Sequence, residues 1–179
     1  MHKEYKISRL FLSPVGEIAL SRMPGSVTRI EEDVAAIIAG NYVCVVTLVS
    51  HEELTRHGGQ RLAMLLKNAK IEWCHFPIDD YGTPRPSQDH EWNDLSKHLH
   101  EHLEFNRKIL IHCYAGVGRS GMIALRLLVE RGLKPVPALA QIREVRSGAV
   151  ERPAQYEWAT RIKHDVDIHF KESKKCWIT

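Results

Sequence analysis

The chain has 179 residues, of which 44% are hydrophobic and 26% are charged, and its formal net charge is +3 at pH 7. This composition is typical of one soluble globular domain, here over residues 1–179 with a frayed tail from about residue 171, and so weak a charge does not indicate nucleic-acid binding. No segment reaches the roughly 18 apolar residues of a membrane span, and the N-terminus lacks the apolar core of a secretory signal. We therefore expect a cytoplasmic protein, and a monomer.

Strand-like and helix-like segments alternate along the chain. Runs of apolar and β-branched residues predict strands at residues 16–25, which close with a turn at Pro24 and Gly25, and at 42–50, 71–78 and 108–113. Apolar residues at helical spacing, with proline at helix starts and glycine at helix ends, predict helices at 29–41, 60–69, 89–106, 120–131, 137–146 and 153 to about 170. This alternation predicts an α/β fold with a central, mainly parallel sheet flanked by helices on both faces.

The segment ILIHCYAGVGRSGM, residues 109–122, places Cys113 at the end of a predicted strand, where ligands bind in parallel sheets. Gly116 and Gly118 give the following loop backbone freedom, so its N–H groups can form a nest for an anion at the start of the next helix. Arg119 adds a guanidinium that can grip two phosphate oxygens. These features predict a phosphate cradle with Cys113 at its floor.

Cys113 is expected to be a reactive thiolate, because helix N-termini and nearby cations lower the pKa of cysteine from about 8.5 to roughly 3.5–7.5. A thiolate below a bound phosphoryl group is a nucleophile directed at phosphorus. The alternative is an ordinary buried cysteine next to a surface arginine. No Lys-Ser/Thr follows Gly118, so a nucleotide-binding loop fits poorly, and no acidic or histidine cluster lies nearby. We expect a reaction without metal or cofactor.

The string HCYAGVGRSG resembles the signature loop of the cysteine-dependent protein tyrosine and dual-specificity phosphatases. The likeness extends from about Gly16 to Ala159 and is greatest to the kinase-associated phosphatase type. The resemblance implies a phosphatase domain in which Cys113 forms a phosphocysteine, Arg119 clamps the phosphate and Ser120 assists the departing sulfur. It also implies that the phosphate contacts Cys113, Tyr114, Ala115, Gly116, Val117, Gly118 and Arg119. His112 either orients the thiolate region or is a satisfied core histidine; both readings stay open.

The general acid of this family lies upstream in a pattern like Asp-x-Gly-x-Pro, which DDYGTP matches through Asp80, whereas Asp79 is one position out of register. A plain turn is the alternative. Tyrosine-specific relatives place the attacking water with a Gln-Thr-x-x-Gln element. Here Glu151 takes its first position and only Gln155 remains, to position water or merely to cap.

The substrate is expected to be a phosphoprotein or phosphopeptide carrying phosphotyrosine, and secondarily phosphoserine or phosphothreonine, because the cradle lacks the lysines of phosphoinositide-specific relatives. Tyr81 and Arg85 are candidates to flank the entrance, although an exposed arginine is more often only solvated. The alternatives are a phosphoinositide or other non-protein phosphatase and a module that binds phosphate without turnover.

Cysteine and histidine spacing raises two further hypotheses. The four cysteines lack Cys-x-x-Cys spacing, which argues against a zinc ribbon or disulfide framework. Cys44 is expected in the core, whereas Cys74 and Cys176 are candidate disulfide partners for an oxidised Cys113. A metal protein is a weaker reading, and a solvated helix face is favoured for the three histidines that prompt it, His98, His100 and His102.

Overall fold

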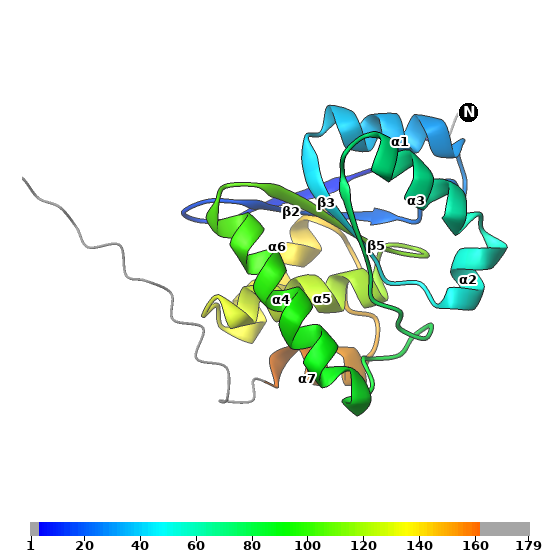
Figure 1. The fold of residues 1–179 in the computed structure, drawn as a ribbon. Coiled ribbons are helices and arrows are strands. Elements are labelled where there is room, and N and C mark those ends of the chain that lie inside the picture. Colours follow the sequence, from blue (N-terminus) through cyan, green and yellow to red (C-terminus); the bar gives the residue numbers. More distant parts are fainter. Residues whose placement is uncertain (1–3, 162–179) are drawn as a thin grey trace, which may run out of the picture.

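A five-stranded sheet forms the centre of the computed structural model, which describes residues 4–161 (Figure 1). Its strands lie in the order β1-β2-β5-β3-β4, and only β1 runs antiparallel to its neighbour. The strand bounds are β1 Ser8–Phe11, β2 Glu17–Arg22, β3 Tyr42–Thr47, β4 Glu72–His75 and β5 Lys108–Cys113. The prediction of a mainly parallel sheet is therefore confirmed.

Helices cover both faces of this sheet. Helices α1 and α3 lie on one face and α4, α5, α6 and α7 on the other (Figure 1). The helix bounds are α1 Ile30–Ala39, α2 His51–Arg56, α3 Gly59–Asn68, α4 Asp89–Glu104, α5 Gly118–Glu130, α6 Pro135–Val145 and α7 Pro153–Thr160, with a short 3₁₀ turn at Pro86–Gln88. None of the helices within residues 4–161 has the length and apolar character needed to cross a bilayer.

Successive residues of the central strands enter different cores. Val46 of β3 and Ile111 of β5 pack against the α4–α7 side, whereas Val45 and Leu110 pack against α1 and α3. Side chains of a strand alternate between its faces, so a sheet covered on both sides requires continuous apolar strands. This requirement explains why β3 and β5 have no polar and apolar alternation in the sequence.

Two elements were not predicted. Strand β1 has only four residues at the edge of the sheet, and its polar and apolar residues are too few to form a recognisable period. Helix α2 has six residues, but it begins with a capping box in which Ser50 accepts from the Glu53 N–H and the Glu53 carboxylate accepts from the Ser50 N–H. Ser-x-x-Glu is a helix-start signal, so Ser50 and Glu53 do indicate the start of α2 in the sequence.

Some predicted boundaries were wrong. Helix α5 begins at Gly118 rather than Ser120, and α6 begins at Pro135 rather than Pro137. The predicted continuation of α7 to about Phe170, like the frayed tail, lies outside the described residues.

The solvated histidine face predicted for α4 was also wrong. His100 and His102 are only 2% and 7% exposed, because α4 packs against α5 and the β4 edge. His100 contacts Glu130 of α5, and His98 and His102 contact Glu72 of β4.

Candidate active site

Cys113 is the last residue of β5 and lies buried at the carboxyl edge of the sheet. The next four residues form a loop, and α5 starts immediately after them. The structure thus brings together the strand end, the loop and the helix N-terminus that the sequence predicts.

Backbone groups hold the two ends of this loop. The Met23 N–H donates to the Tyr114 carbonyl at 3.0 Å, and the Val150 N–H donates to the Val117 carbonyl at 3.3 Å. Both donors come from segments distant in sequence. The carbonyls at the two ends of the loop therefore face the surrounding protein.

Arg146, at the end of α6, holds the middle of the loop. Its Nε donates to the Gly116 carbonyl and its Nη2 donates to the Ala115 carbonyl, both at 2.8 Å. In a trans peptide the N–H points opposite to the C=O, so four carbonyls turned outward direct the N–H groups of residues 115–118 inward. One of these is the Gly116 N–H, which donates to Cys113 Sγ at 3.2 Å.

The two loop glycines are required for different reasons. Gly116 has a φ of +74°, and a Cβ at this position would overlap the backbone of Ser21 and lie 2.6 Å from Arg22 N. Gly118, in contrast, does not have a positive φ, although the sequence predicted unusual backbone angles for both glycines, because it is already the first residue of α5. It is small for another reason: a Cβ there would meet the carboxylate of Glu151.

Arg119 is buried and connects three segments. Its Nη1 and Nη2 donate to the two carboxylate oxygens of Glu53 at 2.6 and 2.9 Å, and Nη1 also donates to the Ile78 carbonyl at 3.0 Å. Although burial opposes it, the hydrogen bonds to Glu53 raise the pKa of Arg119. The guanidinium is therefore a fixed positive charge in the site.

Asp80, rather than Asp79, faces this charge. Asp80 Oδ1 lies 3.0 Å from Arg119 Nη2, although the Asp80 side chain is 60% exposed. The Asp79 carboxylate pairs instead with Arg85 at 3.0 Å on the surface. Arg85 is therefore engaged by Asp79, and its place at the entrance of the site stays a prediction.

Helix α7 anchors the loop that carries Asp80. The guanidinium of Arg152 lies over the Tyr81 ring at 4.4 Å, and Gln155 Nε2 donates to the Gly82 carbonyl at 3.3 Å. Gln155 Oε1 accepts from the Glu151 N–H at 3.1 Å. The buried Gln155 side chain thus caps α7 and ties the Asp80 loop to it.

Ser120 contacts the Cys113 side chain, whereas the preceding strand residue His112 contacts Thr47 and the Cys113 carbonyl. His112 Nε2 lies 2.7 Å from Thr47 Oγ1, which also accepts from Trp73 Nε1 at 2.9 Å. Burial lowers the pKa of His112 to about 4, so its ring is neutral at pH 7. Ser120 Oγ lies 3.5 Å from Cys113 Sγ, within hydrogen-bond range of a sulfur atom.

The disulfide hypothesis for Cys74 was wrong. Cys74 lies two strands away from β5, level with Ile111, which puts its Cα about 12 Å from that of Cys113 at ordinary strand spacings. Bridged cysteines have Cα atoms less than about 7 Å apart. Cys74 Sγ instead lies 3.8 Å from Cys44 Sγ. Cys176 lies outside the described residues.

Two residues that shape this site, Glu53 and Arg146, were not predicted from the sequence. Each acts through a contact between segments far apart in sequence, as shown by the Arg119–Glu53 and Arg146–Gly116 pairs. The capping box of α2 was a usable signal for the position of Glu53. No sequence signal distinguishes Arg146 from the other arginines in helices.

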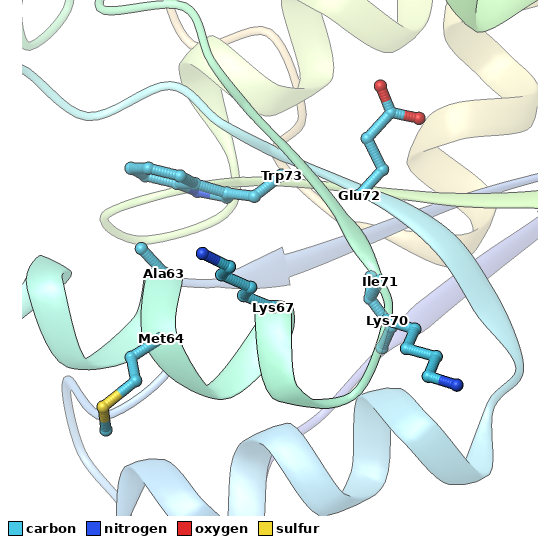
Figure 2. Close-up of a pocket in the computed structure, with 7 residues that line it drawn as sticks. All are labelled: Ala63, Met64, Lys67, Lys70, Ile71, Glu72 and Trp73. Carbon is cyan, nitrogen blue, oxygen red and sulfur yellow. The ribbon is translucent and has the colours of Figure 1, made fainter.

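A depression of about 760 Å³ lies elsewhere, between α3 and the β4 edge (Figure 2). Its lining residues are Ala63, Met64, Lys67, Lys70, Ile71, Glu72 and Trp73. None of them belongs to the Cys113 loop, and none is among the residues that surround Cys113, such as Arg119, Ser120 and Asp80. The candidate active site is therefore the cradle around Cys113.

Known proteins are similar in sequence to most of this chain. The chain is 33% identical over 132 residues to cyclin-dependent kinase inhibitor 3 of Rattus norvegicus, covering 72% of this chain but only 61% of that protein. It is 28% identical to the dual specificity protein phosphatase OPG106 of vaccinia virus, over 86% of this chain and 92% of the viral one.

The fold is also shared with a solved structure. A kinase associated phosphatase crystallised with serine in place of its catalytic site cysteine matches with a TM-score of 0.77 and 28% identity, over 89% of this chain and 94% of that one. The family model described as "Swiss Army Knife protein, DSP-PTPase phosphatase domain" matches residues 16–161. The chain therefore belongs to this family of DSP-PTPase phosphatase domains.

Proposed function

We propose that this protein is a phosphoprotein phosphatase that hydrolyses phosphate monoesters through a phosphocysteine intermediate. One observation carries the proposal: Cys113 Sγ lies under inward-facing loop N–H groups, next to an Arg119 guanidinium that also faces Asp80. The names of the viral and kinase-associated relatives support the same activity.

In the first step a phosphate dianion takes the place of Asp80 on Arg119 Nη2, and the loop N–H groups bind its non-bridging oxygens. Cys113 Sγ forms a bond to phosphorus while the bond from phosphorus to the ester oxygen breaks. Asp80, protonated in the complex, gives its proton to the departing oxygen. The products of this step are a free hydroxyl group and a phosphocysteine.

In the second step water attacks phosphorus and the sulfur leaves as a thiolate. Asp80, now ionised, accepts a proton from the water, and the Ser120 hydroxyl donates a hydrogen bond to the departing Cys113 sulfur. Glu53 keeps the Arg119 guanidinium in place throughout, since it is bound to both of its terminal nitrogens. Inorganic phosphate and the original thiolate result.

The rim of the site favours phosphotyrosine as the first substrate, with phosphoserine and phosphothreonine second. Tyr81 and Tyr114 are 52% and 42% exposed and so offer ring surface to an aromatic substrate. Loop residues Tyr114, Ala115 and Val117 add no positive charge for the additional phosphates of an inositol phospholipid.

Hydrolysis of p-nitrophenyl phosphate, phosphopeptides and phosphoinositides by the purified chain tests the proposal. We expect phosphate release from the aryl phosphate and the phosphotyrosine peptide, and a loss of at least about a thousandfold in Cys113→Ser, as for the removal of other catalytic nucleophiles. Binding without turnover by the wild type would establish a phosphate-binding module instead. A preference for the lipids would establish a phosphoinositide phosphatase.

A further inference from the structure

A second cluster of reactive side chains lies away from Cys113, where α4 packs over β3 and β4. It consists of Cys44, Glu72, Cys74, His98 and His102, here called the α4–β4 cluster. Figure 2 shows the Glu72 carboxylate pointing away from α3, as expected for a strand residue whose neighbour Trp73 packs on the α3 side. Glu72 and Cys74 are two residues apart on β4 and therefore share the face that meets α4.

Short distances connect the members of the cluster. Cys44 Sγ and Cys74 Sγ are 3.8 Å apart, and Cys74 Sγ is 3.8 Å from Glu72 Oε1. His98 Nε2 lies 2.7 Å from the same Glu72 oxygen. Candidate ligand atoms of Glu72, Cys74 and His98 all lie within 4.8 Å of one another, and so do those of Cys44, Glu72 and His102.

Two of these three distances, those between the sulfur atoms and between Cys74 Sγ and Glu72 Oε1, match the edges of a tetrahedral zinc site. With Zn–S bonds of about 2.3 Å and Zn–O bonds of about 2.1 Å, two sulfur ligands lie about 3.8 Å apart and a sulfur and an oxygen about 3.6 Å apart. The Glu72–His98 pair needs to open by roughly 0.7 Å, as expected when a metal replaces the hydrogen-bonding proton. Glu72 and His98 are partly exposed, which gives an ion a route from solvent.

The fifth member of the cluster, His102, contacts Glu72 but is not available as a metal ligand. Its Nε2 lies 3.0 Å from the second Glu72 oxygen, and Arg107 Nη1 lies 3.3 Å from its Nδ1. Arginine can only donate, so Nδ1 accepts and Nε2 carries the hydrogen that it donates to Glu72. A nitrogen that carries a hydrogen has no lone pair for a metal.

We propose that Cys44, Cys74, Glu72 and His98 bind one zinc ion, and that His102 is a positioning residue that orients the carboxylate of Glu72. Two thiolates, an imidazole and a carboxylate form a ligand set that favours zinc over magnesium or calcium. The ion replaces the two thiol protons, which are released to solvent, and the hydrogen that His98 Nε2 donates to Glu72 moves to His98 Nδ1, so that no oxidation occurs.

The proposed zinc site is separate from the candidate active site. Cys44 pairs in register with Ile109, four residues before Cys113, so the two sites lie about 13 Å apart along the strand direction. A zinc ion at the α4–β4 cluster would fasten α4 to the edge of the sheet and take no part in the proposed hydrolysis.

Zinc titration of the reduced, chelator-treated chain in competition with a chromophoric chelator tests this proposal. We expect one zinc per chain, with affinity reduced at least about 100-fold in Cys74→Ser and in His98→Gln. A change of about 10–100-fold is expected in His102→Gln, as for other residues that orient a metal ligand. Cobalt should give a thiolate charge-transfer band in the wild type that is markedly weaker in Cys74→Ser, which keeps only the Cys44 thiolate.

Two controls locate the ion. His90→Gln changes an exposed histidine of the same helix, and Cys113→Ser removes the thiol of the candidate active site; both variants should still bind one zinc. Should Cys74→Ser fail to give a folded circular dichroism spectrum, Glu72→Gln replaces it, because Glu72 is exposed. No stoichiometric binding by the reduced wild type, or binding lost in Cys113→Ser but retained in Cys74→Ser, would overturn the proposal.

Discussion

At the residue scale, Arg119 links the parts of the candidate active site. One buried guanidinium contacts the α2 carboxylate of Glu53, the chain after β4 at Ile78 and the exposed carboxylate of Asp80. The Glu53 contact is bidentate and fixes the plane of the guanidinium, whereas Asp80 makes a single ion pair at the surface. An incoming phosphate therefore displaces Asp80 more readily than Glu53.

The contrast between the two neighbouring aspartates gives a matched experiment. We expect Asp80→Ala to lower kcat by about 10²–10⁴-fold, the usual range for removal of a general acid, because Glu53, the other carboxylate on Arg119, is held by both terminal nitrogens of the guanidinium. Asp79→Ala should change kcat by less than about threefold, because it removes only an exposed ion pair with Arg85.

Steady-state kinetics with a phosphotyrosine peptide, whose leaving group depends on protonation, measures both variants. An equal effect of the two substitutions, or a larger effect of Asp79→Ala, would show that the register of the Asp-x-Gly-x-Pro element is wrong. An aryl phosphate with a good leaving group should be less sensitive to Asp80→Ala, which separates loss of the acid from loss of the fold.

At the element scale, the sequence predicted long elements with a strong period and missed short ones. Strands β3 and β5 were found because burial on both faces requires continuous apolar residues. The start of α6 was placed at Pro137 instead of Pro135 because the first-turn N–H groups of a helix have no internal partner, so a proline is tolerated throughout that turn. The local sequence therefore does not determine whether α6 begins at Pro135 or at Pro137.

In the candidate site, residues close together in sequence were predicted and residues far apart in sequence were not. Cys113, Gly116 and Arg119 are close in sequence, so their spacing alone predicted a cradle. Glu53 and Arg146 reach it across 66 and 30 residues respectively, and only the packed fold brings them there. The burial of His100 and His102 could not be predicted from the sequence of α4 either, because it depends on the packing of this helix against α5 and β4.

Helices α4 and α5 are joined by a buried polar hub centred on Glu130. The Glu130 carboxylate accepts from Trp92 Nε1 at 3.1 Å, Ser96 Oγ at 2.5 Å and Arg126 Nε at 2.6 Å. We expect Glu130→Ala to lower the free energy of unfolding by about 3–5 kcal/mol, because it leaves the Arg126 charge without its buried partner. Urea unfolding followed by circular dichroism measures the change.

The matched control is Glu101→Ala, which removes an exposed carboxylate from α4 and should alter the free energy of unfolding by less than about 0.5 kcal/mol. If both variants unfolded at the wild-type midpoint, the Glu130 hub would contribute nothing to the packing of α4 on α5.

At the scale of the whole molecule, His112 makes stability depend on pH. Burial lowers its pKa from 6.5 to about 4, so between these values the unfolded chain binds a proton that the folded chain does not. The free energy of unfolding must therefore fall as the pH is lowered from about 6.5 to about 4, by on the order of 3 kcal/mol for a shift of this size.

Urea midpoints measured at intervals between pH 4.5 and 7 reveal this dependence. Glutamine does not titrate and can still bond to Thr47, so His112→Gln should flatten the slope while other groups, such as Glu130, contribute equally to both proteins. Identical slopes for wild type and His112→Gln would mean that the buried imidazole is protonated as readily as an exposed one.

The outward-facing carbonyls around Cys113 have a consequence for the whole fold. Their partners come from the turn after β2, the end of α6 and the chain before α7, so no fragment containing only residues 109–122 retains the geometry that captures an anion. The phosphate-binding shape belongs to the assembled domain, and loosening α6 would abolish it without altering a single atom of the motif.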